Sequence, residues 1–109
     1  MAVDDKANLE ISLMAKVTFA PRLQDKADLM EGRLLKSLNQ RLKIIAGMTV
    51  ESLLRDSHII RGTSQPDTLW VTRVSYDHRL IFRRTGTDSI EAVDVVSHED
   101  LNKFVGLRP

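Results

Sequence analysis

The alternation of apolar and polar residues changes its period along the chain. Every second position from residue 9 to residue 19 is apolar, namely Leu9, Ile11, Leu13, Ala15, Val17 and Phe19. A period of two is typical of a half-buried strand. Pro21 follows at once and suits the first turn of a helix, because its fixed backbone angle is already helical. The pattern therefore predicts a strand that leads directly into a helix.

Beyond Pro21 the spacing of apolar residues lengthens to that of a helix. One helical face carries a stripe made of Leu34, Leu35, Leu38, Leu42 and Ile45. Gly32 predicts a division into two helices, one near residues 21–30 and one near residues 32–46. Gly47 is expected to cap the second helix at its C-terminus.

The second half of the chain predicts a short helical turn, three strands and a final helix. Thr49 is suited to cap the short turn. Polar turn residues then separate segments whose patterns favour strands near residues 68–75, 78–84 and 89–96. Ser97 lies three residues before Asp100, close to the spacing of a capping box, which predicts a helix over residues 97–104.

The order of these elements, β-α-α-β-β-β-α, predicts an α+β fold. We expect a curved, mainly antiparallel four-stranded sheet with the N-terminal helical hairpin on one face. The core should contain the leucine stripe and the inward-facing strand residues Trp70, Val74, Leu80 and Phe82. Residues 1–8 are polar and predict a flexible tail, and residues 9–109 predict a single domain.

The composition limits the class of protein. The 109 residues include 42% hydrophobic residues and no cysteine, which fits a globular domain without disulfides or thiolate metal sites. No apolar run approaches the roughly 18 residues that span a bilayer. Asp4 and Asp5 precede any apolar stretch, unlike the basic start of a signal peptide. We therefore expect a cytoplasmic protein with no membrane partner.

Positive charge is concentrated in one segment although the net charge is only +1. Residues 58–84 contain two aspartates, Asp67 and Asp77, and five arginines, which gives a local net charge of +3. The arginines are Arg61, Arg73, Arg79, Arg83 and Arg84. A guanidinium group is planar and always charged, so it suits phosphate. The alternative is an exposed sheet edge whose charges only prevent aggregation.

Residues 70–84, "WVTRVSYDHRLIFRR", contain two predicted strands around a polar turn. Strand parity places Arg73 on one face, and Arg79 and Arg83 on one face of the next strand. If the hairpin brings these faces together, the three arginines form a patch. Tyr76 and His78 lie in or beside the turn. They add groups that stack on bases or exchange protons near neutral pH.

Taken in order, these segments resemble the RelE/ParE superfamily of small bacterial toxins. The similarity covers roughly Ala15 to Phe104 and rests on "AKVTFAPRLQDKAD", "HIIRG", "LWVTRV", "HRLIFRR" and "DVVSHEDLNKF". It implies a partner antitoxin whose chain wraps the toxin, with operator DNA bound only through that antitoxin. It also implies one of two activities: cleavage of messenger RNA on the ribosome, as in RelE-like members, or inhibition of DNA gyrase, as in ParE-like members.

The resemblance also suggests which residues form the site. Arg73 and Arg79 match basic catalytic or phosphate-binding positions of RelE-like toxins, and His98 matches a histidine found at the end of the last strand. We take these three as catalytic candidates. The candidates for RNA or phosphate binding are Arg61, Arg83, Arg84, His78 and Tyr76. We expect an antitoxin segment to bind across or beside the surface of Arg73, Arg79 and Arg83, by strand addition or as a helix in a groove.

Cleavage of RNA at such a site would need no metal and no cofactor. The 2′-hydroxyl attacks the neighbouring phosphate, cations hold the phosphate, and an acid protonates the leaving oxygen. No Asp, Glu or His cluster has the spacing of metal ligands. Val71, Glu99 and Phe104 stand where RelE-like enzymes usually carry basic or hydroxyl groups. The alternative is therefore a non-nuclease, which inhibits gyrase or only binds its antitoxin and helps to repress the operon.

Overall fold

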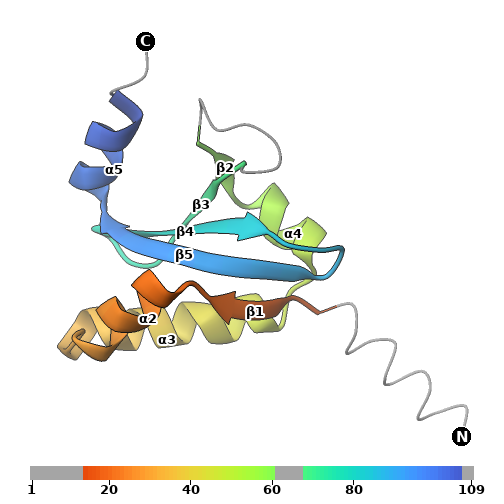
Figure 1. The fold of residues 1–109 in the computed structure, drawn as a ribbon, viewed down its shortest axis with the longest axis horizontal. Helices are drawn as coiled ribbons and strands as arrows, with labels where there is room; N and C mark the ends of the chain where they lie inside the picture. Colours follow the sequence, from red (N-terminus) through yellow and green to blue (C-terminus); the bar gives the residue numbers. More distant parts are fainter. Residues whose placement is uncertain (1–13, 61–67, 107–109) are drawn as a thin grey trace, which may run out of the picture.

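The computed structural model describes residues 14–60 and 68–106, with side chains up to residue 102. The described chain forms strands and helices in a single α+β arrangement (Figure 1). In order they are β1 (Lys16–Phe19), α2 (Pro21–Asp28), α3 (Gly32–Ala46), α4 (Val50–Arg55), β2 (His58–Ile59), β3 (Trp70–Arg73), β4 (His78–Arg84), β5 (Ser89–Ser97) and α5 (His98–Gly106).

The sheet has five strands in the order β1-β5-β4-β3-β2. β1 runs parallel to β5, and the other neighbours are antiparallel. The prediction of an α+β fold with a mainly antiparallel sheet is confirmed, but the count of four strands is wrong. The additional strand is β2, which has only two residues and pairs His58 with Val71 and Ile59 with Trp70. Two residues are too few to show a period of two in a sequence.

The predicted strand over residues 9–19 is observed only from Lys16, at the edge of the sheet. Residues 9–13, like the predicted tail over residues 1–8, lie outside the described residues. Before β1, Met14 forms an isolated bridge with Thr49.

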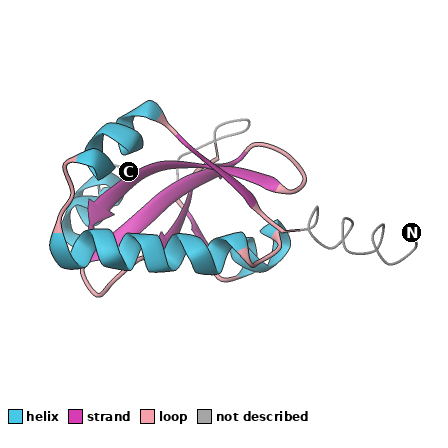
Figure 2. Cartoon of the chain, turned by 90° about the horizontal axis from the view of Figure 1, so that it is seen from below, coloured by secondary structure: helices cyan, strands magenta, loops and turns pink. Residues whose placement is uncertain are grey.

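The helical hairpin covers one face of the sheet, with the long helix α3 lying across it (Figure 2). Leu38 and Ile45 of the predicted stripe are buried, while Leu34 and Leu42 are half-buried against the same core. Leu35 lines a groove between α2 and α3 instead. Burial of this stripe, at about 25 cal/mol per Å², therefore holds the hairpin on the sheet.

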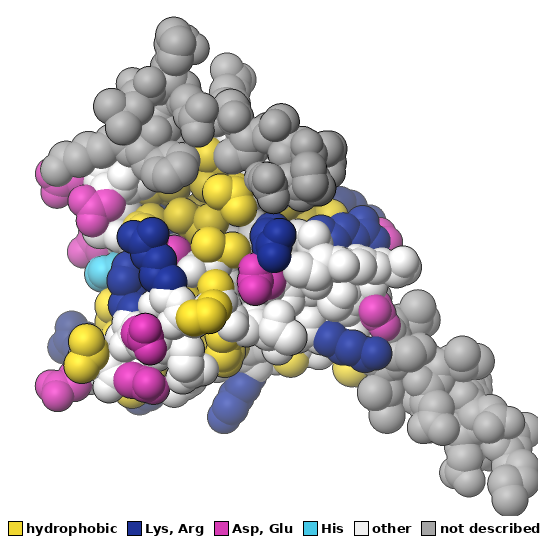
Figure 3. Space-filling view, in the orientation of Figure 1, with side chains coloured by type: hydrophobic (Ala, Val, Ile, Leu, Met, Phe, Trp, Pro, Cys, Tyr) yellow, Lys and Arg dark blue, Asp and Glu magenta, His cyan; other side chains and the backbone are white. Residues whose placement is uncertain are grey.

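The two faces of the sheet carry separate apolar clusters because side chains alternate along β4. Leu80 and Phe82 point into the core under the helices, together with Val74 and half-buried Trp70, as predicted. Ile81 points to the other face. There it packs with Ile60, Val71 and Leu101, the last from α5. Figure 3 shows apolar side chains gathered over this second face, beside α5.

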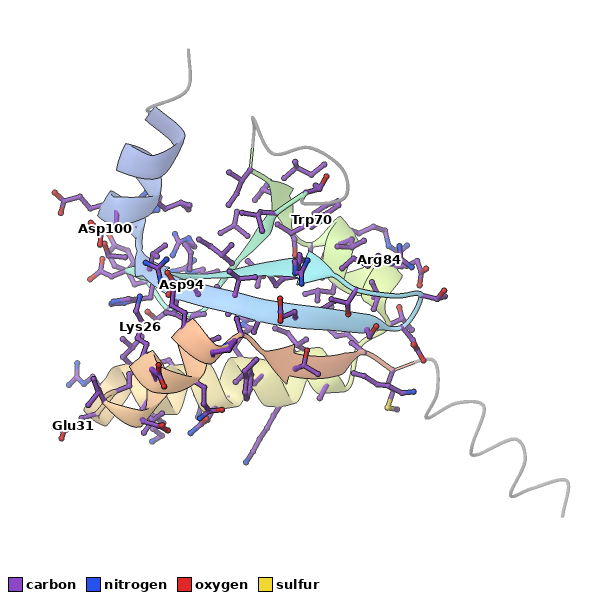
Figure 4. All side chains as sticks on the ribbon, viewed as in Figure 1. Lys26, Glu31, Trp70, Arg84, Asp94 and Asp100 are labelled. Atoms are coloured by element: carbon purple, nitrogen blue, oxygen red, sulfur yellow. The ribbon has the colours of Figure 1, made fainter. Side chains whose placement is uncertain are left out.

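A bulge in β5 interrupts its pairing with β4. Ile81 pairs with Asp94 but Phe82 pairs with Ala92, so Val93 is an extra residue. Beyond this bulge β1 has ended, and α2 lies beside β5 in its place. Lys26 Nζ donates to Asp94 Oδ1 over 2.7 Å and to the carbonyl oxygen of Val95 over 2.9 Å, which ties α2 to the strand (Figure 4).

Turns and caps follow the sequence closely. Ser52 N–H donates to Thr49 Oγ1 over 3.1 Å, so Thr49 caps α4 as predicted. Gly32 begins α3 with φ of 65°, a left-handed conformation that favours glycine. Gly47 occupies the C-cap of α3 as predicted, but with φ of −93° and therefore without the left-handed conformation. In the described part of the chain, no helix is long and apolar enough to cross a membrane.

Candidate functional site

The hairpin of β3 and β4 places Arg73 directly opposite Arg79. Val74 N–H donates to the carbonyl oxygen of His78, and hydrogen-bonded and non-hydrogen-bonded pairs alternate along antiparallel strands. Arg73 and Arg79 therefore form a non-hydrogen-bonded pair, the kind in which side chains lie closest. Both project to the face opposite the helical hairpin. Like charges in this position destabilise a sheet, so the pair needs compensation.

Backbone carbonyl groups of the β3–β4 turn supply that compensation. Arg79 Nη1 donates to the carbonyl oxygens of Ser75 at 2.9 Å, His78 at 3.0 Å and Tyr76 at 3.2 Å. Arg73 Nε donates to the carbonyl oxygen of Ser75 at 3.3 Å. The two guanidinium groups are therefore held side by side at one end of the sheet by oriented peptide dipoles rather than by a carboxylate.

The N-terminus of α5 is attached to the same turn. His98 N–H donates to the carbonyl oxygen of Asp77 over 2.6 Å, and Asp100 N–H donates to Ser97 Oγ over 3.0 Å. Ser97 is thus the N-cap that the capping-box spacing predicted. This attachment places the exposed imidazole of His98 at the end of the sheet where the two arginines lie.

One cavity of about 470 Å³ brings the three catalytic candidates together. Arg73, Arg79 and His98 all line it. Three further ionisable residues share the lining, namely Arg41 from α3, Asp56 from the end of α4 and His58 from β2. The cavity lies at the edge of β3, beyond the point where β2 stops pairing with it.

Arg41, Asp56 and His58 are not among the site residues predicted from the sequence. Asp56 and His58 precede the predicted hairpin by more than ten positions. Arg41 is one of several basic residues of α3, and its sequence neighbours do not distinguish it from the others. No local motif connects these residues to the arginines. Only the packing of α3 and α4 against the sheet brings them together.

The structure separates the remaining candidates from this cavity. His78 lies on the other face of the sheet, where it lines a different cavity with Lys26 and Met30. Tyr76 is 81% exposed in the turn, with its ring centroid 6.0 Å from Arg73 Cζ, and so remains near the arginine pair. Arg61 lies outside the described residues.

Arg83 and Arg84 occupy the far part of β4. Arg83 shares the face of Arg79, but its Nε donates to Glu91 Oε1 on β5 over 2.7 Å. Arg84 turns to the opposite face and donates to Glu51 Oε1 at 3.2 Å and to two carbonyl oxygens of the β4–β5 turn. Figure 4 shows Arg84 at the end of the sheet remote from Asp100 and α5. The predicted patch of three arginines is therefore a pair, with Arg83 paired separately on the same face.

This arrangement can bind a phosphate and move a proton. Two guanidinium groups provide a positive, donor-rich wall, and His98 provides an ionisable group on the same cavity. Among the described residues, no group of three His, Cys, Asp or Glu side chains is placed to hold a metal ion. The two arginines and His98 offer electrostatic and acid–base chemistry.

Comparison with known proteins identifies the fold. No protein-family model matches the sequence, and no curated protein matches it. Among solved structures, the chain is similar to one described as archaeal RelE–RelB complex from Pyrococcus horikoshii OT3, with TM-score 0.57, 13% identity, and 77% of this chain and 94% of that chain covered. It is also similar to a YoeB/ParE toxin from Agrobacterium tumefaciens, with TM-score 0.51, 13% identity, and 76% and 98% covered. The chain therefore has the fold of the RelE/ParE-type toxins.

Proposed function

We propose that this protein is the toxin of a type II toxin–antitoxin pair and inhibits translation by cutting messenger RNA on the ribosome. The observation that carries the proposal is that Arg73, Arg79 and His98 line one cavity together, on a fold shared with RelE and YoeB/ParE toxins. The partner is an antitoxin protein. The Pyrococcus RelE was solved together with RelB, which supports a partner of that kind.

The proposed reaction is an internal displacement at phosphorus. The 2′-oxygen of the substrate forms a bond to phosphorus and loses its proton, while the bond from phosphorus to the 5′-oxygen breaks and that oxygen gains a proton. Arg73 and Arg79 stabilise the charge that develops on the phosphate oxygens. His98 exchanges one of the protons, and Asp56 and His58, on the same cavity, provide the second ionisable group that the reaction needs.

The proposal is tested by measuring protein synthesis and DNA synthesis in the same cells. Expression of the chain alone should stop incorporation of labelled amino acids within minutes and leave DNA synthesis intact at first. Arg73→Ala and His98→Ala should restore translation, whereas Arg33→Ala should not, because Arg33 is exposed on α3 and does not line the cavity. Continued translation together with early arrest of DNA synthesis would contradict the proposal.

A second function is favoured by the contacts of Arg79. Its Nη1 donates to three carbonyl oxygens of the turn, which gives this arginine a structural role independent of RNA. If Arg79 only shapes the turn, the protein is the non-nuclease alternative. It then inhibits DNA gyrase, or binds its antitoxin and assists repression. A supercoiling assay with purified gyrase tests for gyrase inhibition, since neither a messenger RNA nuclease nor a co-repressor would change supercoiling.

The groove between α2 and α3 suits one segment of the antitoxin. It has a volume of about 230 Å³, and its apolar lining includes Leu23, Leu35, Leu38, Leu42 and Phe19, the last 43% exposed. Such a groove accepts the apolar face of an amphipathic helix. Phe19→Ala should weaken the complex with the co-encoded antitoxin at least tenfold. Leu29→Ala removes another exposed apolar side chain, outside the groove, and should not. Equal losses for both variants would place the antitoxin elsewhere.

A further inference from the structure

Arg41 has an unusual environment for an arginine on the outer layer of a fold. It lies on α3 and is half-buried, and its Nε is buried without a hydrogen-bond partner among the described residues. Buried donors are almost always hydrogen-bonded, because a buried N–H without an acceptor keeps its full desolvation cost. No hydrogen bond of Nε to another described residue accounts for the position of Arg41, and its side chain lines the cavity described above.

The cavity that Arg41 lines has a strongly positive wall. The lining contains three guanidinium groups and one carboxylate, from Arg41, Arg73, Arg79 and Asp56. With the histidines neutral, the formal charge of the lining is +2. Arg41 approaches from the helical layer, whereas Arg73 and Arg79 project from the opposite face of the sheet. The three guanidinium groups therefore surround the edge of β3 instead of forming a flat patch, as an anion held from several sides requires.

The size and surroundings of the cavity favour a nucleotide over an acidic peptide. A volume of about 470 Å³ lies within the range of small-molecule sites. An RNA phosphodiester carries one negative charge, so a formal charge of +2 can balance the phosphate together with the negative charge that develops on it during cleavage. The exposed ring of Tyr76, 6.0 Å from Arg73 Cζ, provides a surface on which a base attached to that phosphate can stack.

We propose that Arg41 is a phosphate-binding residue, and that its guanidinium group donates to a nucleotide phosphate held jointly with Arg73 and Arg79. This inference rests on the proposed function and deepens it, because it extends the RNA-binding surface from the arginine pair around the edge of β3 to helix α3. It also separates the roles of the arginines. Arg79 is partly committed to the turn, whereas no hydrogen bond ties Arg41 Nε to another described residue.

The test combines ligand binding with stability in the full-length protein. Arg41→Met keeps an unbranched apolar stem but removes the guanidinium group. Inorganic phosphate and adenosine 3′-monophosphate are titrated while the arginine Nε–H signals are followed by NMR. The wild type should show a shift of the Arg41 signal, and Arg41→Met should bind both probes about 10- to 100-fold more weakly. Arg33→Met, an exposed change on the same helix, should bind them as the wild type does.

Thermal unfolding distinguishes a binding role of Arg41 from a structural role, because the two roles predict opposite changes in the unfolding temperature of Arg41→Met. Without ligand, Arg41→Met should unfold at the same or a higher temperature than the wild type, since it removes a buried donor that lacks an acceptor. Lower stability with unchanged phosphate binding would overturn the inference. So would binding of a hexaglutamate peptide by the wild type with no binding of either phosphate probe.

The two proposals fail separately. Phosphate binding that depends on Arg41, in a protein that cuts no RNA, supports the inference and removes the nuclease proposal. Cleavage of RNA by a wild type whose phosphate affinity is unaffected by Arg41→Met overturns the inference and leaves the nuclease proposal intact.

Discussion

Replacement of Asp94 by asparagine is expected to lower the free energy of unfolding by about 1–3 kcal/mol. The side chain of Asp94 is 9% exposed, and its Oδ1 accepts hydrogen bonds from Lys26 Nζ at 2.7 Å and from Val95 N–H at 2.8 Å. Breaking a fully buried ion pair costs about 3–5 kcal/mol. The side chain of Lys26 is 41% exposed, so water can reach its ammonium group and the expected loss is smaller.

A double-mutant cycle isolates the pair from its surroundings. Asp94→Asn, Lys26→Met and the combined variant are unfolded in urea, and the interaction energy between the two sites should lie between about 0.5 and 3 kcal/mol. Arg22 is the matched control. Its Nε lies 3.5 Å from Asp94 Oδ2 and its side chain is 78% exposed, so solvent screening should keep the effect of Arg22→Ala within about 0.5 kcal/mol.

The result also tests how α2 is held in place. If Lys26 ties α2 to the edge of β5 beyond the bulge, loss of the pair should increase hydrogen exchange of the α2 amides before global unfolding. An interaction energy below about 0.3 kcal/mol, or equal effects of Arg22 and Lys26, would show that apolar packing alone fixes α2, for example through Leu23.

Three further changes test the fold by urea denaturation. Leu38→Ala removes a buried side chain of the stripe and should cost about 2–5 kcal/mol; an unchanged midpoint would show that α3 is not packed there. Thr49→Ala removes the acceptor for Ser52 N–H and should cost about 0.5–2 kcal/mol, whereas Thr49→Ser should be nearly neutral. Gly32→Ala meets no atom within 4 Å but is strained at φ of 65°, so it should cost about 1–2 kcal/mol; a stabilising effect would contradict that conformation.

The sequence predicted those elements in which a local pattern is long enough to repeat. The stripe from Leu34 to Ile45 extends over three helical turns, and the helices follow it closely. Ser97 and Thr49 were recognised because a cap depends on a few neighbouring residues. β2 was missed because two residues show no period. The bulge at Val93 was missed as well, because a bulge depends on the register with another strand.

The site was predictable in part for the same reason. Arg73 and Arg79 lie on adjacent strands joined by a short turn, so strand parity predicts a shared face if the hairpin brings the two faces together, and the structure pairs the two residues directly. His78, next to Arg79, points to the opposite face because neighbouring strand residues alternate. Arg41 and Asp56 reach the cavity only through tertiary packing, and no spacing in the sequence contains that information.

The most direct measurement of the central claim is cleavage of ribosome-bound messenger RNA by the purified protein. Wild type and Arg33→Ala are compared with Arg73→Ala and His98→Ala, after thermal unfolding has shown that all four are folded. The account predicts that wild type and Arg33→Ala leave fragments ending in a 2′,3′-cyclic phosphate, and that each of the other two variants cuts about 10²–10³-fold more slowly. Intact message with the folded wild type, or equal cleavage by all four proteins, would contradict it.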